Sequence, residues 1–230
     1  MQAVLLAAGR GVRLRPHTDT TPKSMLPLAG KPLLEHIIAS LPGAIDELLI
    51  AIGYRGEQVR DYFGDHFGGL PVRYGFQDPI NGTGTALHLF KEQLRGEFLV
   101  VNGDDLYAPE DLKALGQGGP ACLVFAEQQA VPSAVIEDRN HSLVGLEEKG
   151  FPKKENLRIC GAYLLNQKFF RQPLAKIEVR GGTEYSLPHT LVSMAKETPI
   201  RVQRASWWYP VGTPEQYRYA QELYYSRPAA

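Results

Sequence analysis

The stretch of sequence that decides the fold is AVLLAAGRGVRLRP, which spans residues 3–16. Ala3–Ala7 is a short, continuous apolar run, and such a run is typical of a strand that is buried on both faces. Gly9 and Gly11 follow directly, and small residues there let the backbone approach a ligand and turn its N–H groups towards an anion. A tight turn after a strand has the same glycine spacing. The stretch therefore predicts a buried first strand that ends in either a phosphate loop or a turn.

The first half of the chain alternates expected strands with expected helices. Apolar runs predict strands at Ala3–Ala7, Glu47–Ile52, Leu70–Gly75 and Glu97–Val101. Apolar residues at helical spacing predict helices at Pro32–Leu41, Gly56–Phe63 and Thr83–Leu94. Strands and helices that alternate in this way imply crossover connections. We therefore expect an α/β, Rossmann-like fold with a mostly parallel central sheet and helices on both faces.

The second half of the chain changes character. Its apolar segments are short and separated by turns, at Ala121–Ala126, Ser133–Glu137, Leu143–Leu146 and Arg158–Leu165. Helices are expected near Glu184–Lys196 and Thr213–Tyr225. Ligands in open α/β sheets bind beyond the carboxyl ends of the strands. We expect one domain over residues 1–230, in which a smaller mixed part within 117–230 covers a ligand site formed by 1–116.

Composition narrows the class of partner. The chain has 25 basic and 25 acidic residues, and this balance argues against a nucleic-acid coat or a membrane-surface helix. No apolar run reaches the roughly 20 residues of a membrane helix, and the N-terminus lacks the basic region of a signal peptide. The two cysteines are too few for a disulfide framework or a zinc site. We expect a cytoplasmic protein that binds neither nucleic acid nor membrane.

Positive charge is concentrated in the first loop. Residues 1–31 hold five basic side chains and one acid, Asp19, so their local charge is about +4. No third glycine completes a dinucleotide-binding loop after Gly9 and Gly11, and no Gly-Lys-Ser/Thr completes a Walker A loop. The loop is about 24 residues long, whereas the median connection is about 4–6, and three prolines stiffen it. These features predict a site for a compact anion.

Two segments of this region resemble the N-terminal signature of the sugar-1-phosphate nucleotidylyltransferases. They are LAAGRGVRLRP at residues 6–16, with Val12 in place of the usual Thr, and TPKSMLPLAGKPL at residues 21–33. That family joins a nucleoside triphosphate to a hexose 1-phosphate and releases pyrophosphate, with Mg²⁺ as its cofactor. The resemblance implies a GT-A-like version of the expected fold, with a nucleotide-binding half (1–116) and a sugar-phosphate-binding half (117–230).

A further segment, QDPINGTGTAL at residues 77–87, resembles the family's base-binding glutamine followed by Gly-Thr. A primary amide can accept from N3–H and donate to O4 of uracil or thymine at once. Gln77 therefore favours a pyrimidine nucleotide, UTP or dTTP, over a guanine nucleotide. The resemblance places the nucleotide on Leu6, Ala8, Gly9, Gly11, Arg13, Gln77, Gly82, Thr83 and Gly103.

Adjacent acids close the fourth expected strand in VVNGDDLY, residues 100–107. Mg²⁺ can be held at such a strand end by one or two carboxylates together with substrate phosphates. In the family the first acid after this glycine binds Mg²⁺, which implies that role for Asp104. Asp105 is then either a supporting group or the N-cap of a helix at Pro109–Leu115. Pro210 replaces the family's second metal-binding Asp, so Asp105, a backbone carbonyl or water completes the sphere, or metal binding is weak.

The sugar-phosphate residues come from the second half of the chain. Glu147-Glu148-Lys149-Gly150 resembles the family's Glu-Lys-Pro, which implies that Glu148 binds sugar hydroxyls and that Lys149 holds the sugar phosphate. Gly161 and Trp208 lie in two further segments that resemble the family's sugar-binding motifs. Ile159 replaces a polar residue of the first of these segments.

The implied catalytic residues are Arg13, Lys23, Asp104 and Lys149. The attacking oxygen of the sugar phosphate is already anionic, so positioning and charge neutralisation suffice and no general base is required. In this scheme Arg13 binds the β- and γ-phosphates, and Lys23 binds the α-phosphate.

Two other functions stay open at the level of sequence. One is a nucleotide-binding paralogue without turnover, for which Pro210 and Ile159 are the evidence. The other is transfer to a non-sugar phosphate such as phosphocholine, because aromatic residues at Trp207–Tyr209 could suit a quaternary ammonium. The identity of the sugar, the choice between UTP and dTTP, and homo-oligomer formation are also open. The 230-residue length leaves room for little beyond a transferase core.

Overall fold

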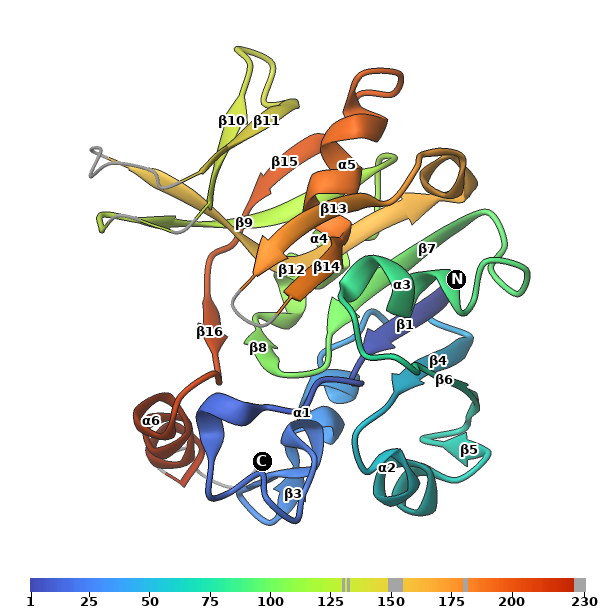
Figure 1. The fold of residues 1–230 in the computed structure, drawn as a ribbon, viewed down its shortest axis with the longest axis vertical. Coiled ribbons are helices and arrows are strands. Elements are labelled where there is room, and N and C mark those ends of the chain that lie inside the picture. Colours follow the sequence, from blue (N-terminus) through green and yellow to red (C-terminus); the bar gives the residue numbers. More distant parts are fainter. Residues whose placement is uncertain (130, 132, 149–154, 180–181, 226–230) are drawn as a thin grey trace.

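The structure is a computed structural model that describes residues 1–129, 131, 133–148, 155–179 and 182–225. Over these residues, the centre of the fold is an eight-stranded sheet with the order β15-β9-β12-β7-β1-β4-β6-β5 (Figure 1). Its strands are β1 (Gln2–Leu6), β4 (Glu47–Ile52), β5 (His66–Phe67), β6 (Leu70–Phe76), β7 (Glu97–Asn102), β9 (Ala121–Glu127), β12 (Asn156–Asn166) and β15 (Arg201–Arg204). The pairs β1–β4, β1–β7, β4–β6 and β9–β15 are parallel, whereas β12 is antiparallel to β7 and β9. The expected α/β fold with a mostly parallel sheet is confirmed.

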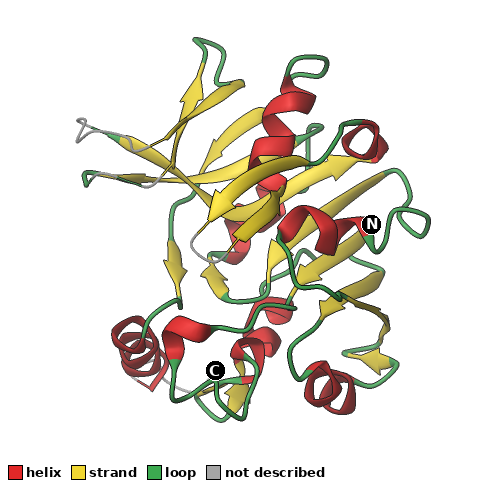
Figure 2. Cartoon of the chain, in the orientation of Figure 1, coloured by secondary structure: helices red, strands yellow, loops and turns green. Residues whose placement is uncertain are grey.

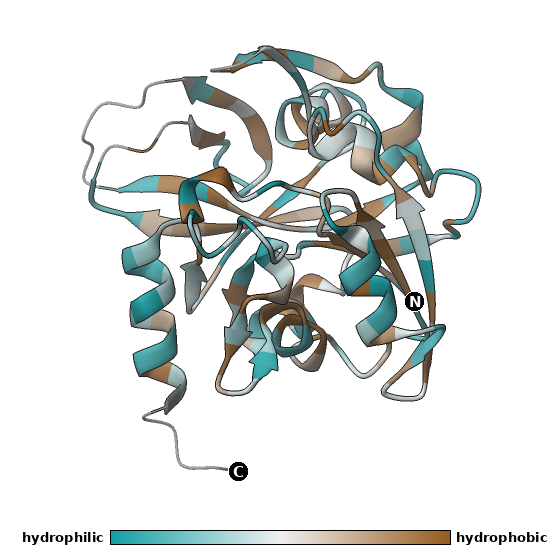
Figure 3. Ribbon diagram, turned by 60° about the horizontal axis from the view of Figure 1, so that its bottom comes forward, coloured by the Kyte–Doolittle hydropathy of each residue, from teal (hydrophilic) through white to brown (hydrophobic). Residues whose placement is uncertain are grey.

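Helices cover both faces of this sheet, as the alternating pattern predicted (Figure 2). One face packs against α1 (Leu33–Ala39), α2 (Gly56–Phe63) and α4 (Pro109–Leu115), and α6 (Pro214–Tyr225) joins the same core beside β2. The other face packs against α3 (Thr83–His88), α5 (Leu187–Ala195) and the 3-10 helix η3 (Gln167–Arg171). In β1, Leu5 belongs to the first core and Val4 to the second, because successive side chains of a strand point to opposite faces. Both faces of β1 are therefore buried, which accounts for its continuous apolar sequence, and Figure 3 shows the central strands as mainly hydrophobic.

Four small antiparallel pairs surround the main sheet. They are β2 (Pro27–Leu28) with β3 (Lys31–Pro32), β8 (Asp105–Tyr107) with β16 (Trp208–Pro210), β10 (Ser133–Glu137) with β11 (Leu143–Glu148), and β13 (Ala175–Val179) with β14 (Gly182–Ser186). Two 3-10 turns, η1 (Val12–Leu14) and η2 (Lys23–Met25), lie in the loop after β1. The β8–β16 pair brings the segment before α6 to the end of β7, and the β13–β14 hairpin lies beside α3.

Two expected helices differ from the structure by more than one or two residues at an end. The helix expected over Thr83–Leu94 ends at His88, and tight turns follow, in which the N–H of Phe90 donates to Leu87 O at 3.1 Å. The apolar spacing there marks buried residues and not the length of the helix. The helix expected near Glu184–Lys196 begins at Leu187, because the Ser186 hydroxyl caps it by accepting from the N–H of His189. Glu184 lies instead in β14, and the β13–β14 hairpin was not predicted.

Among the residues that the structure describes, no helix combines the length and the apolar character needed to span a bilayer.

Candidate active site

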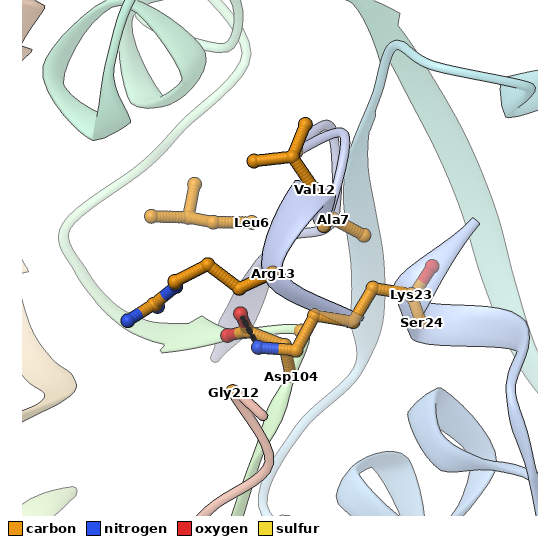
Figure 4. Close-up of a pocket in the computed structure, with 11 residues that line it drawn as sticks. Leu6, Ala7, Val12, Arg13, Lys23, Ser24, Asp104 and Gly212 are labelled. Atoms are coloured by element: carbon orange, nitrogen blue, oxygen red, sulfur yellow. Dashed lines mark hydrogen bonds and ion pairs between the residues drawn. The ribbon is translucent and has the colours of Figure 1, made fainter. Parts of the chain in front are cut away.

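The sequence-predicted loop lies where the strand order reverses, beyond the carboxyl ends of β1 and β7. The chain runs from β1 to β4 and β6 on one side of the sheet and then returns to β7 on the other side. A cavity of about 210 Å³ opens at this point, and we call it the first cavity (Figure 4). Its lining includes Gly9, Gly11, Arg13, Lys23, Gly103 and Asp104. The structure thus gathers residues from three separate segments of the sequence around one space.

The loop after β1 folds tightly back on itself at Gly11. Gly11 has φ 59° in the left-handed region, and a Cβ at this position would lie 3.1 Å from both the Lys23 Cβ and the Thr18 Cγ2. The Thr18 hydroxyl donates to Gly11 O at 2.8 Å. Glycine is therefore required for this turn, both for its backbone conformation and for the close approach of the Lys23 segment.

The two cations of the first cavity are held differently. The Lys23 ammonium is bonded to the Asp104 carboxylate, and its side chain is only 11% exposed. Arg13 approaches the same space beside Gly212, since a Cβ on that glycine would lie 3.4 Å from the Arg13 Nη2. Among the described residues, no acidic side chain pairs with Arg13. Its guanidinium is therefore available to an anion in the cavity.

Asp104 and Asp105 occupy different environments although they are adjacent. The Asp104 side chain is 36% exposed and lines the first cavity. Asp105 is buried in β8 opposite Pro210, and its carboxylate accepts from the Asn102 Nδ2 at 3.3 Å. Burial, followed by the charge of Asp104, raises the pKa of Asp105 to about 7. The N-cap of α4 is Ala108, so the capping role considered for Asp105 is wrong.

Asp104 fits a metal ion that arrives together with phosphate ligands. Mg²⁺ commonly takes one or two carboxylates from the protein and further oxygens from phosphates and water. In the part of the chain that the structure describes, no three His, Cys, Asp or Glu side chains gather into a metal cluster. The Asp104 carboxylate, at the edge of a cavity with cations around it, matches a site completed by a bound phosphate.

A second cavity of about 230 Å³ adjoins the first and shares Leu6, Gly9 and Asp104 with it. It contains the remaining residues predicted to bind the nucleotide, namely Ala8, Gln77, Gly82 and Thr83. With Gly103 in the first cavity, the structure brings all nine of those residues to two adjoining spaces.

Two hydrogen bonds within the protein fix the orientation of the Gln77 amide. Gln77 is 4% exposed, and its Nε2 donates to Gly82 O at 2.8 Å and to Thr85 Oγ1 at 2.9 Å. The Thr85 hydroxyl in turn donates to Asn81 Oδ1 at 2.6 Å. In this orientation both amide hydrogens are used within the protein, and neither is left to donate to O4 of a base. What the side chain offers to the cavity is the acceptor Oε1.

A third cavity of about 320 Å³ continues from the second, with Thr83 and Asn102 common to both. Its lining includes Gly161, Ile159 and Arg158, which come from one of the two segments that resemble sugar-binding motifs. Lys149 and Gly150 lie outside the described residues, and of Glu148 only its position at the end of β11 is described.

Trp208 is not brought to these cavities. Its side chain is 6% exposed within the hydrophobic core, and the Arg158 guanidinium lies 4.9 Å from the centroid of its ring. Trp208 therefore does not line the third cavity. It packs against Arg158, which does.

Four residues of the site were not singled out by the sequence analysis. Asn102 lies between the second and third cavities, and its place directly before Gly103 was the signal that could have identified it. Asn81 and Thr85 support Gln77 from within the quoted Gly-Thr segment. Glu184 lines the second cavity, but it could not be found because its segment was expected to be helical.

Comparisons with known proteins agree with this geometry. A family model described as nucleotidyl transferase matches residues 2–227. The bifunctional protein GlmU of Methanocaldococcus jannaschii is 31% identical over 215 residues, which cover 93% of this chain and 52% of that protein. The D-glycero-alpha-D-manno-heptose 1-phosphate guanylyltransferase of Campylobacter jejuni is 32% identical over 173 residues, which cover 74% of this chain and 78% of that protein. The chain spans about half the length of the GlmU relatives it matches.

The fold is also similar to that of a UDP-glucose pyrophosphorylase in a crystal structure with UDP-glucose. The TM-score is 0.81 at 22% identity, and the alignment covers 99% of both chains. At this identity the likeness supports the fold.

Proposed function

The chain belongs to the nucleotidyl transferase family, and on that premise we propose that it joins a pyrimidine nucleoside triphosphate, UTP or dTTP, to a sugar 1-phosphate. The products are a nucleoside diphosphate sugar and pyrophosphate. A hexose phosphate such as glucose 1-phosphate is the proposed acceptor. The reaction draws on small molecules of the cytoplasm, where we place the protein.

The observation that carries this proposal is the series of three adjoining cavities. The first has cations for phosphates, the second has an acceptor for a base, and the third has room for a sugar. Asp104 is shared by the first and second cavities and Asn102 by the second and third, so the spaces proposed for phosphates, base and sugar adjoin at these two residues. A protein that binds only a nucleotide would need only the first two cavities.

In the proposed reaction, an anionic oxygen of the sugar phosphate attacks the α-phosphorus of the nucleotide. A new P–O bond forms as the bond to the bridging oxygen of pyrophosphate breaks, and the electron pair leaves with pyrophosphate. No proton has to move in this step. Lys23 binds the α-phosphate, Arg13 binds the β- and γ-phosphates, and Lys149 holds the incoming phosphate. Rate acceleration comes from alignment and charge neutralisation.

Asp104 is the proposed Mg²⁺ ligand. When bound, Mg²⁺ would neutralise charge on the phosphate oxygens. Before the nucleotide binds, Lys23 compensates the Asp104 carboxylate. Lys23 can then move its hydrogen bonds to the α-phosphate when a cation takes its place at Asp104.

The proposed base selectivity rests on the Gln77 Oε1. An acceptor at this position meets the N3–H of uracil or thymine, whereas the corresponding N3 of cytosine has only a lone pair. Guanine also has a ring N–H, so GTP belongs in any panel of nucleotides that tests the proposal.

For the sugar, we propose that Glu148 and Gly161 contact the hydroxyls. Arg158 extends over Trp208 and pairs with Glu127 at 3.2 Å, which fixes the wall of the third cavity. We assign Trp208 to the positioning of Arg158. Because Trp208 is buried and packs against Arg158, it is not available to an aromatic cage of the kind that phosphocholine would need.

A second candidate function is a binding paralogue without turnover, which Pro210 favours. A matrix of UTP, dTTP, CTP and GTP against several sugar 1-phosphates, measured by pyrophosphate release, tests the proposal. Calorimetry with the same nucleotides, with and without Mg²⁺, separates the two candidates. Pyrophosphate release that depends on a sugar phosphate supports the enzyme, and tight binding without release supports the paralogue.

A further inference from the structure

The β13–β14 hairpin is attached directly to the loop that lines the second cavity. The N–H of Tyr185 donates to Asn81 O at 2.8 Å, and the N–H of Leu187 donates to Thr83 Oγ1 at 3.1 Å. Gly82 has φ 117°, and a Cβ there would overlap the backbone of Tyr185. These contacts hold the backbone that directly follows Glu184 against the 81–83 loop.

One face of this hairpin borders both the second and the third cavity. Glu184 lies opposite Ile177 in the β13–β14 register, and residues two apart in a strand share a face, which adds Ser186. Ile177 and Ser186 line the third cavity, whereas Glu184 lines the second. Glu184 therefore lies near the junction of the two cavities, on the same space as Gln77 and Asp104.

The Glu184 carboxylate is free to accept a hydrogen bond from a ligand in the second cavity. Among the described residues, no hydrogen bond or ion pair involves this side chain, which is exposed on the cavity. An ionised carboxylate only accepts hydrogen bonds. The phosphates of a nucleotide are anions that repel it, and the ring N–H of the base faces the Gln77 Oε1. The donors of the nucleotide that remain are the ribose hydroxyls, which lie between base and phosphates.

We propose that Glu184 accepts a hydrogen bond from the ribose 2′-hydroxyl, so that the chain selects a ribonucleotide, UTP, over a deoxyribonucleotide. This inference rests on the proposed function, because it assumes that a nucleotide occupies the second cavity. It resolves the choice between UTP and dTTP in favour of UTP. Glu184 acts as a specificity-determining residue and takes no part in bond breaking.

The test compares UTP with 2′-deoxy-UTP, which differ only in the hydroxyl. Wild type should favour UTP by about 10- to 100-fold in kcat/KM, as expected for a hydrogen bond to a charged group. Glu184→Ala should reduce this ratio to below about 3-fold, and Glu184→Gln, which keeps a neutral acceptor, should give an intermediate ratio. Glu178→Ala is the matched control, because Glu178 lies in the same hairpin and bonds to Thr183 at 3.0 Å. The control should keep the wild-type ratio.

Calorimetric binding of UDP and 2′-deoxy-UDP gives a second readout that needs no turnover. The same loss of preference in Glu184→Ala is expected there. An unchanged preference in that variant overturns the inference. An equal loss for both nucleotides, accompanied by a higher Mg²⁺ requirement, also overturns it, because Glu184 would then be a metal ligand. If wild type releases no pyrophosphate from any nucleotide, the proposed function fails, while the diphosphate binding data still decide the role of Glu184.

Discussion

Substitution of Thr85 by valine tests how the base is read. Gln77 is held by two acceptors, Gly82 O at 2.8 Å and Thr85 Oγ1 at 2.9 Å. Turning the amide by half a rotation would break both bonds and direct Oε1 at the Gly82 carbonyl. Thr85→Val keeps the shape of the side chain and removes one of the two acceptors. The energetic preference for the observed orientation of the amide should therefore decrease.

The size of the effect follows from the hydrogen bond that is lost. A neutral hydrogen bond contributes about 0.5–1.5 kcal/mol net, which corresponds to about 2- to 13-fold. With the observed orientation, wild type should prefer UTP over CTP, because Oε1 and cytosine N3 are both acceptors. In Thr85→Val the reversed amide can donate to cytosine N3 at a smaller cost. The ratio of kcat/KM for UTP over CTP should fall by about 2- to 10-fold, mainly through faster reaction with CTP.

The assay is the initial rate of pyrophosphate release with UTP and with CTP at a saturating concentration of the best sugar 1-phosphate. Thr190→Val is the control, because Thr190 is fully buried in α5 and its hydroxyl donates to Ser186 O at 2.7 Å. A loss of stability alone would lower both rates together and leave their ratio unchanged. The reasoning is refuted if Thr85→Val keeps the wild-type ratio, or if Thr190→Val changes the ratio as much.

Three further predictions concern the metal, the base loop and the buried acid. Removal of divalent cations with EDTA should abolish pyrophosphate release and added Mg²⁺ should restore it. The half-maximal concentration of free Mg²⁺ should fall as the UTP concentration rises, because Asp104 is the one acid among the described residues of the first cavity and the phosphates of bound UTP supply the other ligands. A half-maximal concentration independent of UTP would indicate a preformed metal site. Gly82→Ala should lower the free energy of unfolding in urea by about 1–3 kcal/mol, since alanine is strained at φ 117° and meets the Tyr185 backbone, and an unchanged midpoint would contradict the described packing. Asp105→Asn should be more stable than wild type at pH 8. The pKa of Asp105 is raised from 3.8 to about 7, so between these pH values the folded state keeps a proton that the unfolded state loses. The free energy of unfolding of wild type therefore falls as the pH rises from about 4 to 7, by up to about 4 kcal/mol. Urea denaturation at pH 5 and pH 8 checks this, and a difference between the two proteins that does not grow with pH would show that Asp105 ionises normally.

The sequence predicted those elements in which the pattern of apolar residues matches the burial of the element in the structure. β1 and β4 are buried on both faces, so their apolar runs identified them, and the strand at Glu47–Ile52 has the expected bounds. The Thr83–Leu94 segment failed because its apolar residues are buried whether the chain is helical or turned. β14 was missed because its residues are mostly polar and exposed, whereas β13 alternates apolar and polar residues over Ala175–Val179, a signal that the sequence analysis did not use.

The same distinction holds for the site. Gly9, Gly11, Arg13, Lys23 and Asp104 lie in contiguous motifs whose spacing has a chemical reason, and the structure gathers them around one cavity. The orientation of the Gln77 amide depends on Gly82 and Thr85, so residue type alone could not determine which of its atoms faces the cavity. Trp208 was identified by its neighbours in the sequence, but its burial is decided by the β8–β16 pairing, which joins segments about 100 residues apart.

The central claim is that Arg13, Lys23 and Asp104 hold a nucleoside triphosphate for transfer to a sugar phosphate. The most direct measurement is pyrophosphate release from UTP, with and without a panel of sugar 1-phosphates, by wild type and by Arg13→Ala, Lys23→Ala and Asp104→Ala. We predict release that requires a sugar phosphate and that falls by about 10²- to 10³-fold in each variant. Near-normal turnover in all three variants, or no release by wild type with any sugar phosphate, would contradict the account.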